Sequence, residues 1–245
     1  SSKIPFGQRF LNIKLANPDK FIYVIDNGGG GGVNYPTIVG NLLVENIFIE
    51  PQVASILKEG KYRNLIRVFK EQRISANLLG VQKLDQLRFP TERLFFGMRP
   101  SANVGPTDWW RYGIINIQPI TFPIHIPPNQ LAFRTINLPK LEPALKKIQF
   151  LTQNVIIINE DGPEYYNTVQ PLFKGRDLRG SGLMMHSFAA DSDTNKISGY
   201  YNISTSREFN IKFEANTTGE IYILAYCLNW LEIDERGNVT LLYNS

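Results

Sequence analysis

The stretch Glu208-Phe-Asn-Ile-Lys-Phe-Glu214, followed by the turn Asn216-Thr-Thr-Gly219 and the long apolar run Glu220–Ile233, decides the fold class. Apolar and polar residues alternate in the first stretch, and this spacing puts Ile211 and Phe213 on the same face of a β-strand. Because turn residues separate it from a second β-branched and aromatic run, the pair predicts antiparallel strands with one buried face.

The same pattern recurs along most of the chain, as short apolar runs between Pro, Gly and Asn residues. The other predicted strands are Arg9–Leu15, Phe21–Ile25, Leu42–Ile49, Asn64–Ile74, Arg93–Met98, Ile114–Phe122, Leu131–Asn137, Lys147–Leu151, Val155–Asn159, Leu183–Ala189, Gly199–Ile203 and Val239–Tyr243. Their alternation predicts five further core side chains, those of Leu11, Ile13, Leu15, Val68 and Phe95.

Helical patterns are confined to two short segments, Pro51–Lys58 and Leu141–Lys146. About a dozen strands with so few helical residues predict an all-β sandwich, with a jelly roll as the favoured form. The segments 99–113, 123–130 and 160–182 are expected to be long loops between strands. No repeat or linker divides the sequence, so we expect a single domain over residues 1–245.

Composition excludes several classes of protein. The 245 residues are 43% hydrophobic and 20% charged, which indicates a globular chain and not a disordered one. The net charge is +4 and the basic residues are scattered, so no nucleic-acid groove is indicated. We find no signal peptide and no apolar run long enough for a transmembrane helix. The first residue is Ser1, so we expect a piece of a longer chain.

Residues that carry chemistry are few. Neither His125 nor His186 has a His, Cys or carboxylate neighbour at metal-ligand spacing, and neither lies in a nucleophile motif. Gly28–Gly32 would let a phosphate approach the backbone, but the following Val33–Pro36 cannot start a helix, so a flexible loop is predicted. We therefore predict no catalytic residue, no cofactor site and no metal site.

Three further features receive structural interpretations. The acidic clusters Asp191–Asp193 and Glu160–Gly162 lack the spacing of a calcium loop and predict turns. Trp109-Trp110-Arg111-Tyr112 predicts a loop anchor or a subunit interface. If Trp109 and Trp110 are exposed, they would stack on sugars, and a jelly-roll carbohydrate-binding module remains an alternative function.

The single cysteine, Cys227, lies in the apolar segment Ile223–Trp230 and is predicted to be a buried free thiol. A lone cysteine also fits a reducing compartment. For this reason we predict no N-glycan at the three sequons, which begin at Asn202, Asn216 and Asn238. At Asn202 we expect the side-chain amide to bond nearby backbone instead.

Several segments are similar to known capsid sequences. Lys3–Ala16 resembles the opening of the second jelly roll in major capsid proteins of the asfarvirus and faustovirus type, and Leu87–Pro100 followed by Asp108–Gly113 resembles an internal strand of the same proteins. Ile197–Ser204 with Arg207–Phe209 resembles a Pro-Ser-Gly-x-x-Asn-x-Ser segment of capsid proteins of large nucleocytoplasmic DNA viruses. Ser198, Gly199, Asn202 and Ser204 match, while Ile197 replaces the proline.

The resemblance implies a structural protein and not an enzyme. It implies that the chain is the second, eight-stranded jelly roll of a double-jelly-roll major capsid protein, with the first roll preceding Ser1. Three copies of such a protein form a capsomer of pseudo-sixfold outline. The expected partners are other copies, neighbouring capsomers, the N-terminal roll and minor capsid proteins, with no direct nucleic-acid contact. The expected location is the virion, assembled in the host cytoplasm.

Overall fold

The computed structural model describes residues 50, 52, 61–105, 108, 111–126, 130–174, 178, 182–191, 196–234 and 239–242. By its internal contacts the chain divides into two compact units: unit 1 spans residues 1–68, 105–109 and 228–245, and unit 2 spans 69–104 and 110–227. The first three predicted strands, their residues Leu11, Ile13 and Leu15, the glycine run and, apart from Gln52, the helix Pro51–Lys58 lie outside the described residues.

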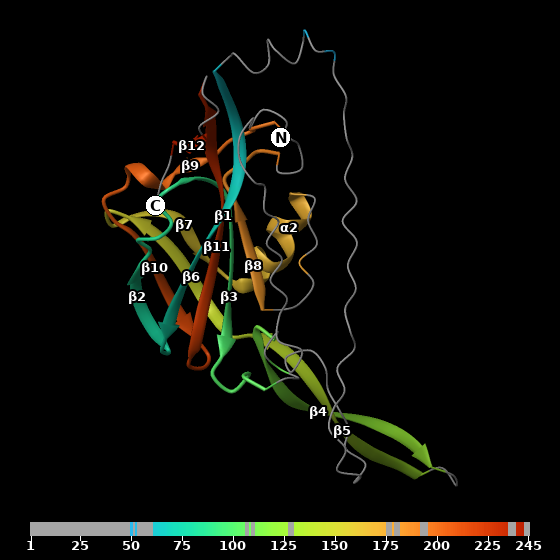
Figure 1. The fold of residues 1–245 in the computed structure, drawn as a ribbon. Coiled ribbons are helices and arrows are strands. Elements are labelled where there is room, and N and C mark those ends of the chain that lie inside the picture. The colour runs from blue at the N-terminus through green and yellow to red at the C-terminus, as the bar shows by residue number, and fades with distance from the viewer. Residues whose placement is uncertain are drawn as a thin grey trace, which may run out of the picture. The chain divides into compact units, whose positions relative to one another are not determined.

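The described strands form two main sheets, drawn in Figure 1. The first has the order β1 (Tyr62–Ala76), β11 (Gly219–Ile233), β3 (Pro90–Pro100) and β8 (Leu183–Ser187), with β9 (Tyr201–Asn202) paired to β3 and β12 (Val239–Leu241) paired to β11. The second has the order β2 (Leu79–Lys83), β10 (Phe209–Ala215), β6 (Leu145–Thr152) and β7 (Val155–Asp161). The predicted all-β, antiparallel fold class is confirmed.

The path of the chain is that of a jelly roll. It passes directly from one sheet to the other between β1 and β2, β2 and β3, β7 and β8, β9 and β10, and β10 and β11, so most sheet neighbours are distant in sequence. Between β3 and β6 the chain forms a separate two-stranded hairpin, β4 (Gly113–Ile126) and β5 (Gln130–Pro143), which pairs with neither sheet.

Aromatic side chains join the two sheets within unit 2. Phe96 on β3 contacts Phe150 on β6 edge to face, with ring centroids 5.4 Å apart, and Phe150 stacks on Phe209 of β10 at 5.8 Å. The Tyr166 ring, from the η2 turn, also meets the Phe96 ring edge to face, with ring centroids 5.7 Å apart. The Tyr166 hydroxyl donates a hydrogen bond to Asn159 O. All four rings are buried, so this cluster forms the centre of the core.

The predicted core positions are only partly correct. Ile211 and Phe213 on β10 are buried as expected, and Val68 is half-buried. Phe95 is a correction, because its side chain is half-exposed on the outer face while Leu94, Phe96 and Met98 point inward. The run Leu94-Phe-Phe96 is apolar on both faces, so its alternation does not fix which face is buried.

Other boundaries also differ from the sequence-based expectations. Leu141–Lys146 is strand and not helix, since it contains the end of β5 and the start of β6. The expected loop 160–182 contains a π-helical turn, η2 (Tyr165–Val169), and the short helix α2 (Gln170–Phe173). A 3₁₀ turn, η3 (Ile203–Thr205), ends the expected strand Gly199–Ile203 early.

Side chains from the η2–α2 segment cover the outer edge of β8, and Figure 1 shows α2 beside that strand. Asn167 Nδ2 donates to Leu183 O, and Gln170 Oε1 accepts from the Ser187 N–H at 3.2 Å. Lys174 Nζ donates to Ala189 O and Ala190 O at 2.7 and 2.9 Å. Leu183 O and the Ser187 N–H at this edge are therefore bonded to side chains and not to a further strand.

Unit 1 is described over the beginning of β1, the end of β11 and β12. Residues Leu231, Glu232 and Ile233 of β11 pair with Leu241, Thr240 and Val239 of β12 in antiparallel register. An exposed ion pair joins Arg63 to Glu232, and such pairs contribute little to stability.

The contrast between Phe95 and Phe96 gives a direct test of the sheet orientation. We expect Phe96→Ala in the full-length gene product to lower the free energy of unfolding by about 3–5 kcal/mol, because it removes a fully buried ring. Phe95→Ala should cost clearly less, because that ring is half-exposed. Urea unfolding of both variants measures the difference. Equal losses would mean that the assigned faces of β3 are wrong.

Candidate functional site

The outer face of the β1–β11–β3–β8 sheet carries arginine and aromatic side chains in rows. Alternate residues of a strand point to opposite faces, so the residues opposite in phase to the core positions share this face. We call it the arginine–tyrosine face. Within unit 2 it comprises Phe69, Glu71 and Arg73 of β1, Tyr222, Leu224 and Tyr226 of β11, and Arg93, Phe95, Gly97 and Arg99 of β3.

Tyr222 lies between two guanidinium groups on this face. The Arg73 and Arg99 guanidinium carbons are 4.9 and 5.0 Å from the centre of its ring, within cation–π range. Arg99 also pairs with Glu220 at 3.1 Å. Burial, followed by a hydrogen bond with Glu220, raises the pKa of Tyr222 to about 12. The phenol is therefore neutral and acts as a packing group.

A second cluster lies around Tyr226. The Arg93 guanidinium is 5.2 Å from the centre of the Tyr226 ring, and the Phe69 ring is 4.8 Å from it on the other strand. The side chain of Phe69 is 61% exposed, which is high for a phenylalanine in the middle of a sheet. This part of the face therefore exposes aromatic side chains on the outside of the sheet.

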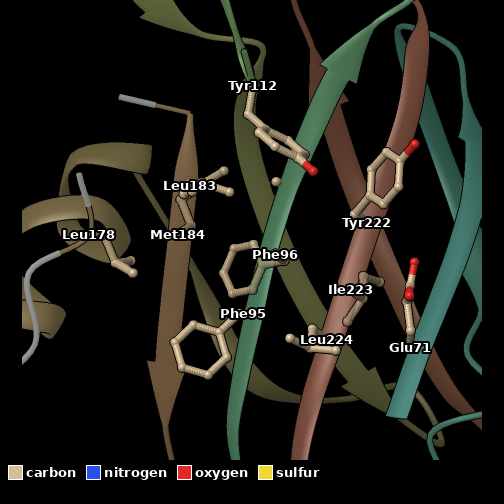
Figure 2. A pocket seen from close by; sticks show the side chains of 11 residues that line it. Glu71, Phe95, Phe96, Tyr112, Leu178, Leu183, Met184, Tyr222, Ile223 and Leu224 are labelled. Atoms are coloured by element: carbon tan, nitrogen blue, oxygen red, sulfur yellow. The ribbon is translucent and has the colours of Figure 1, made fainter. Parts of the chain in front are cut away.

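Between these clusters the face is hollowed, and Figure 2 shows the lining. The hollow has a volume of about 360 Å³, and Phe95, Leu178, Leu183, Tyr222 and Leu224 contribute to its walls. Tyr112 lies across β3, between Leu183 and Tyr222, and its ring meets the Tyr222 ring edge to face at 5.7 Å.

Gly97 makes this arrangement possible. A Cβ atom at position 97 would lie 2.8 Å from Gly182 O and 3.2 Å from Tyr112 Cδ1. The absence of a side chain therefore lets the Tyr112 ring approach the strand. Asn103 supports the Tyr112 backbone from both sides, because its Nδ2 donates to Arg111 O and Gly113 O at 3.0 Å each.

The arrangement suits recognition of another protein surface better than chemistry. Tyrosine and arginine are enriched at protein interfaces, where large rigid side chains bury area at low entropic cost. Among the residues that the structure describes, no three His, Cys, Asp or Glu side chains lie close enough to bind a metal ion. The described residues also contain no helix long and apolar enough to cross a membrane.

The two histidines do not meet. His186 lies on β8 against the rings of Tyr166 and Phe188, at 6.2 and 4.8 Å. Its Nδ1 is buried and has no hydrogen-bond partner among the described residues. Burial and then the charge of Lys174 lower the pKa of His186 to about 4, so the ring is neutral at neutral pH. His125 belongs to β4, and its side chain is not described.

Most of the other residues singled out in the sequence take structural positions or lie outside the description. Trp109 and Trp110 are outside the described residues, whereas Tyr112 of the same cluster packs in the hollow. Asp191 is in a loop, where its backbone N–H donates to Ser198 Oγ at 2.9 Å. Asp193 and the side chains of Glu160 and Asp161 are not described.

Two of the three sequon asparagines are described. Asn202 Oδ1 accepts from the Ser204 N–H at 3.2 Å and from Ser204 Oγ at 2.6 Å, so its amide is bonded locally, as predicted. Asn216 lies in an exposed turn, and its Nδ2 donates to Pro143 O at 3.2 Å. Asn238 lies outside the described residues, and the absence of glycans stays a prediction.

Cys227 is a fully buried free thiol, which confirms the sequence-based prediction. Its Sγ lies 3.5 Å from Thr91 Oγ1. Burial raises the pKa of the thiol to about 11. Only the thiolate is a nucleophile, and this thiol stays protonated at neutral pH. Cys227 therefore packs as a small, unreactive core residue.

Sequence reasoning missed the arginine–tyrosine face as a unit. Its members lie on three strands that are far apart in the chain, and only the strand order brings them together. A partial signal was present, since Arg93 and Arg99 share one phase of β3 and Tyr222 and Tyr226 share one phase of β11. Charged and phenolic side chains at alternate positions mark an outer face.

Comparison with solved structures identifies the class of fold. The chain resembles the faustovirus major capsid protein with a TM-score of 0.59 and 19% identity, over 76% of this chain and 36% of that one. It resembles the capsid protein in a quasi-atomic model of the PBCV-1 virus capsid with a TM-score of 0.61 and 16% identity, over 81% of this chain and 55% of that one. The fold is that of viral major capsid proteins.

Sequence comparison identifies individual relatives of the chain. The whole chain aligns with hexon protein p72 and with the major capsid protein of two African swine fever virus isolates, at 24% identity in each case. The chain spans 46% of the length of these relatives. No protein-family model matches the sequence. The resemblance to major capsid proteins of the asfarvirus and faustovirus type is therefore confirmed.

The environment of His186 predicts a pH dependence of stability. The unfolded chain takes up a proton near pH 6.5, whereas the folded chain does so only near pH 4, so the free energy of unfolding should fall as pH drops between these values. Urea unfolding at pH 7 and pH 4.5 measures this, and His186→Phe should lose that part of the decrease. An NMR titration in which His186 protonates near pH 6.5 would contradict the assignment.

The environment of Cys227 predicts a thiol that does not react in the folded protein. A thiol reagent at pH 8 should label the folded full-length protein at least a hundredfold more slowly than the urea-unfolded protein, because the thiol is buried and protonated. The Cys227→Ser variant measures the labelling of any other cysteines in the full-length protein, and this background is subtracted. Rapid labelling of Cys227 in the folded state would show that β11 opens locally.

Proposed function

We propose that this chain is a structural jelly roll of a major capsid protein, and that copies of that protein form trimeric, pseudo-hexameric capsomers in the icosahedral shell of a large DNA virus. The observation that carries the proposal is the alignment of the whole chain with hexon and major capsid proteins. The jelly-roll path of the described strands supports it independently of sequence.

Within that protein, we assign the chain to the second of two tandem rolls, as a single domain preceded by an N-terminal roll. The alignment with less than half of each relative supports this assignment. So does the set of described strands, because the paths β1–β11–β3–β8 and β2–β10–β6–β7 supply the two four-stranded layers of one roll.

A role in packing fits the surface as well as the fold. The arginine–tyrosine face and its hollow offer a broad aromatic and apolar surface, which is the chemistry of an interface between protein subunits. Cys227 is buried, His186 is half-buried with a buried Nδ1, and both are uncharged at neutral pH, which does not favour acid–base or nucleophilic catalysis by either group. We accordingly propose no enzymatic activity.

The partners in this proposal are other copies of the protein, adjacent capsomers, the N-terminal roll and minor capsid proteins, without direct contact with nucleic acid. The location is the virion, after assembly in the host cytoplasm. The relatives are described as capsid proteins, and this supports the virion as the site of action.

Purified particles and purified protein provide the test. We expect the full-length gene product to be the most abundant protein in icosahedral particles by quantitative mass spectrometry, and to have the mass of a trimer by light scattering. A protein that is absent from particles and monomeric at every concentration would refute the proposal. Binding of glycans by that monomer would favour the carbohydrate-binding alternative.

A further inference from the structure

The β4–β5 hairpin is a two-stranded ribbon that pairs with neither sheet, so its direction depends on how its root is attached to the roll. Consecutive residue pairs join its strands, and the pair nearest the roll is Gly113↔Pro143. In Figure 1 the ribbon runs apart from the other labelled strands of unit 2. At about 3.4 Å per residue, the ribbon is an arm roughly 45 Å long, and a change of about 10° at its root would move its tip by about 8 Å.

The carbonyl groups of the first pair point away from the ribbon. The prolines of β4 and β5, among them Pro143, all occupy odd-numbered positions, and odd-numbered residues pair with each other. Since proline has no N–H, these pairs are the ones that make no hydrogen bonds across an antiparallel ribbon. Their backbone groups point to the outer edges, so Gly113 O and Pro143 O lie on opposite edges of the ribbon.

An asparagine side chain binds each of these two carbonyl groups. Asn103 Nδ2 donates to Gly113 O and also to Arg111 O, at 3.0 Å each. Asn216 Nδ2 donates to Pro143 O at 3.2 Å. We call Asn103 and Asn216 the asparagine clamp. It holds both strands of the ribbon, one from each edge, at the point where they leave the roll.

Both asparagines are attached to the same end of the β3–β11 pair. The Ser101 N–H donates to Thr218 O at 2.9 Å, which joins the turn after β3 to the turn before β11. The Asn103 N–H donates to Pro100 O at 2.9 Å, and Pro100 is paired with Gly219. Strands β3 and β11 are the two central strands of their four-stranded path. The clamp is therefore built on the most firmly held part of the first sheet.

Close packing at the root also restricts the direction of the ribbon. A Cβ atom at position 113 would lie 2.6 Å from Glu142 O, so a side chain does not fit at the first residue of β4. The Asn216 N–H donates to Ala144 O at 2.8 Å, directly after the end of β5. Backbone and side chain of Asn216 thus bind two consecutive carbonyl groups where the chain turns from β5 into β6.

We propose that the asparagine clamp fixes the direction of the β4–β5 ribbon before assembly, and its role in assembly rests on the proposed function. Asn103 is the principal positioning residue, because it is half-buried and uses both hydrogens of its amide. The exposed Asn216 adds one side-chain bond. A free arm of this length would sweep the space beside the roll. Packing copies side by side would then cost the entropy of confining it, whatever the ribbon touches.

Spin-label distances in the full-length gene product test the direction of the ribbon. Labels carried by unnatural amino acids replace Ile120 on the ribbon and Lys212 on β10, which are both exposed. In dilute protein mixed with excess unlabelled protein, we expect one narrow distance distribution. Asn103→Asp keeps the size of the side chain and removes both donors, so it should at least double the width. Asn216→Asp should broaden the distribution less, because the backbone bond to Ala144 O remains.

Asn210→Asp is the matched control. Asn210 is half-buried on β10, and its side chain makes no hydrogen bond with the residues that the structure describes, so the distribution should keep its width. Circular dichroism shows whether each variant is folded. If Asn103→Asp does not fold, Asn103→Ser, which keeps one donor, gives the same comparison. A broad distribution in the unsubstituted protein, or an unchanged narrow one without the Asn103 amide, would overturn the proposal.

Light scattering over a concentration series tests the consequence for assembly. We expect Asn103→Asp to raise the concentration at which half the protein is assembled by about tenfold, as for the loss of two ordinary hydrogen bonds, and Asn210→Asp to change it less than about twofold. A broadened ribbon with unchanged assembly would overturn the role of the clamp in assembly. An unsubstituted protein that stays monomeric would refute the proposed function, and the spin-label distances would still decide whether the clamp fixes the ribbon.

Discussion

The burial of one face of each sheet against the other, centred on the contact between Phe96 and Phe150, is the constraint on which the rest of the structure depends. Each strand has one apolar face, and a sheet with one apolar face has to cover it. The jelly-roll path achieves this because the chain changes sheets repeatedly, as it does between β2 and β3, between β7 and β8, and between β10 and β11. Burial of the inner faces leaves the outer faces free to differ. On the β1–β11–β3–β8 sheet, the outer face carries arginine and tyrosine side chains that contact one another across neighbouring strands.

Much of the fold was predictable because its strands carry strong local signals. The alternation around Ile211 and Phe213 identified β10 and its buried face, and the apolar run after Glu220 identified β11. The phase of β3 was predicted incorrectly, because three consecutive apolar residues fit either face and only tertiary packing selects Phe96. Strand β2 was missed for the opposite reason. Leu79 and Val81 remain exposed, and the strand is held mainly by backbone pairing with β10, which leaves no burial pattern in the sequence.

The candidate site was less predictable than the fold, for a physical reason. The hollow depends on the order of strands in the sheet and on the backbone around Tyr112, which places that ring across Gly97. Neither is encoded in local periodicity. The resemblance to capsid proteins was nevertheless visible in the sequence, because its motifs extend along the chain, and the comparisons confirm that resemblance. His186 shows this difference. The sequence indicated that it has no His, Cys or carboxylate neighbour at metal-ligand spacing, whereas its packing against Tyr166 depends on the position of the η2–α2 segment.

The covering of β8 by side chains of the η2–α2 segment has a consequence for solubility under crowding. In the proposed role, the protein would reach a very high local concentration where particles form, and a bare strand edge would then act as a template for open-ended fibres. Asn167 and Gln170 occupy backbone groups along that edge without presenting new ones in the same direction. Strand addition at β8 is thereby disfavoured, and association through side-chain surfaces is favoured. In the proposed shell, such surfaces would limit each copy to a finite number of neighbours, so that crowding would favour a closed particle over an unlimited polymer.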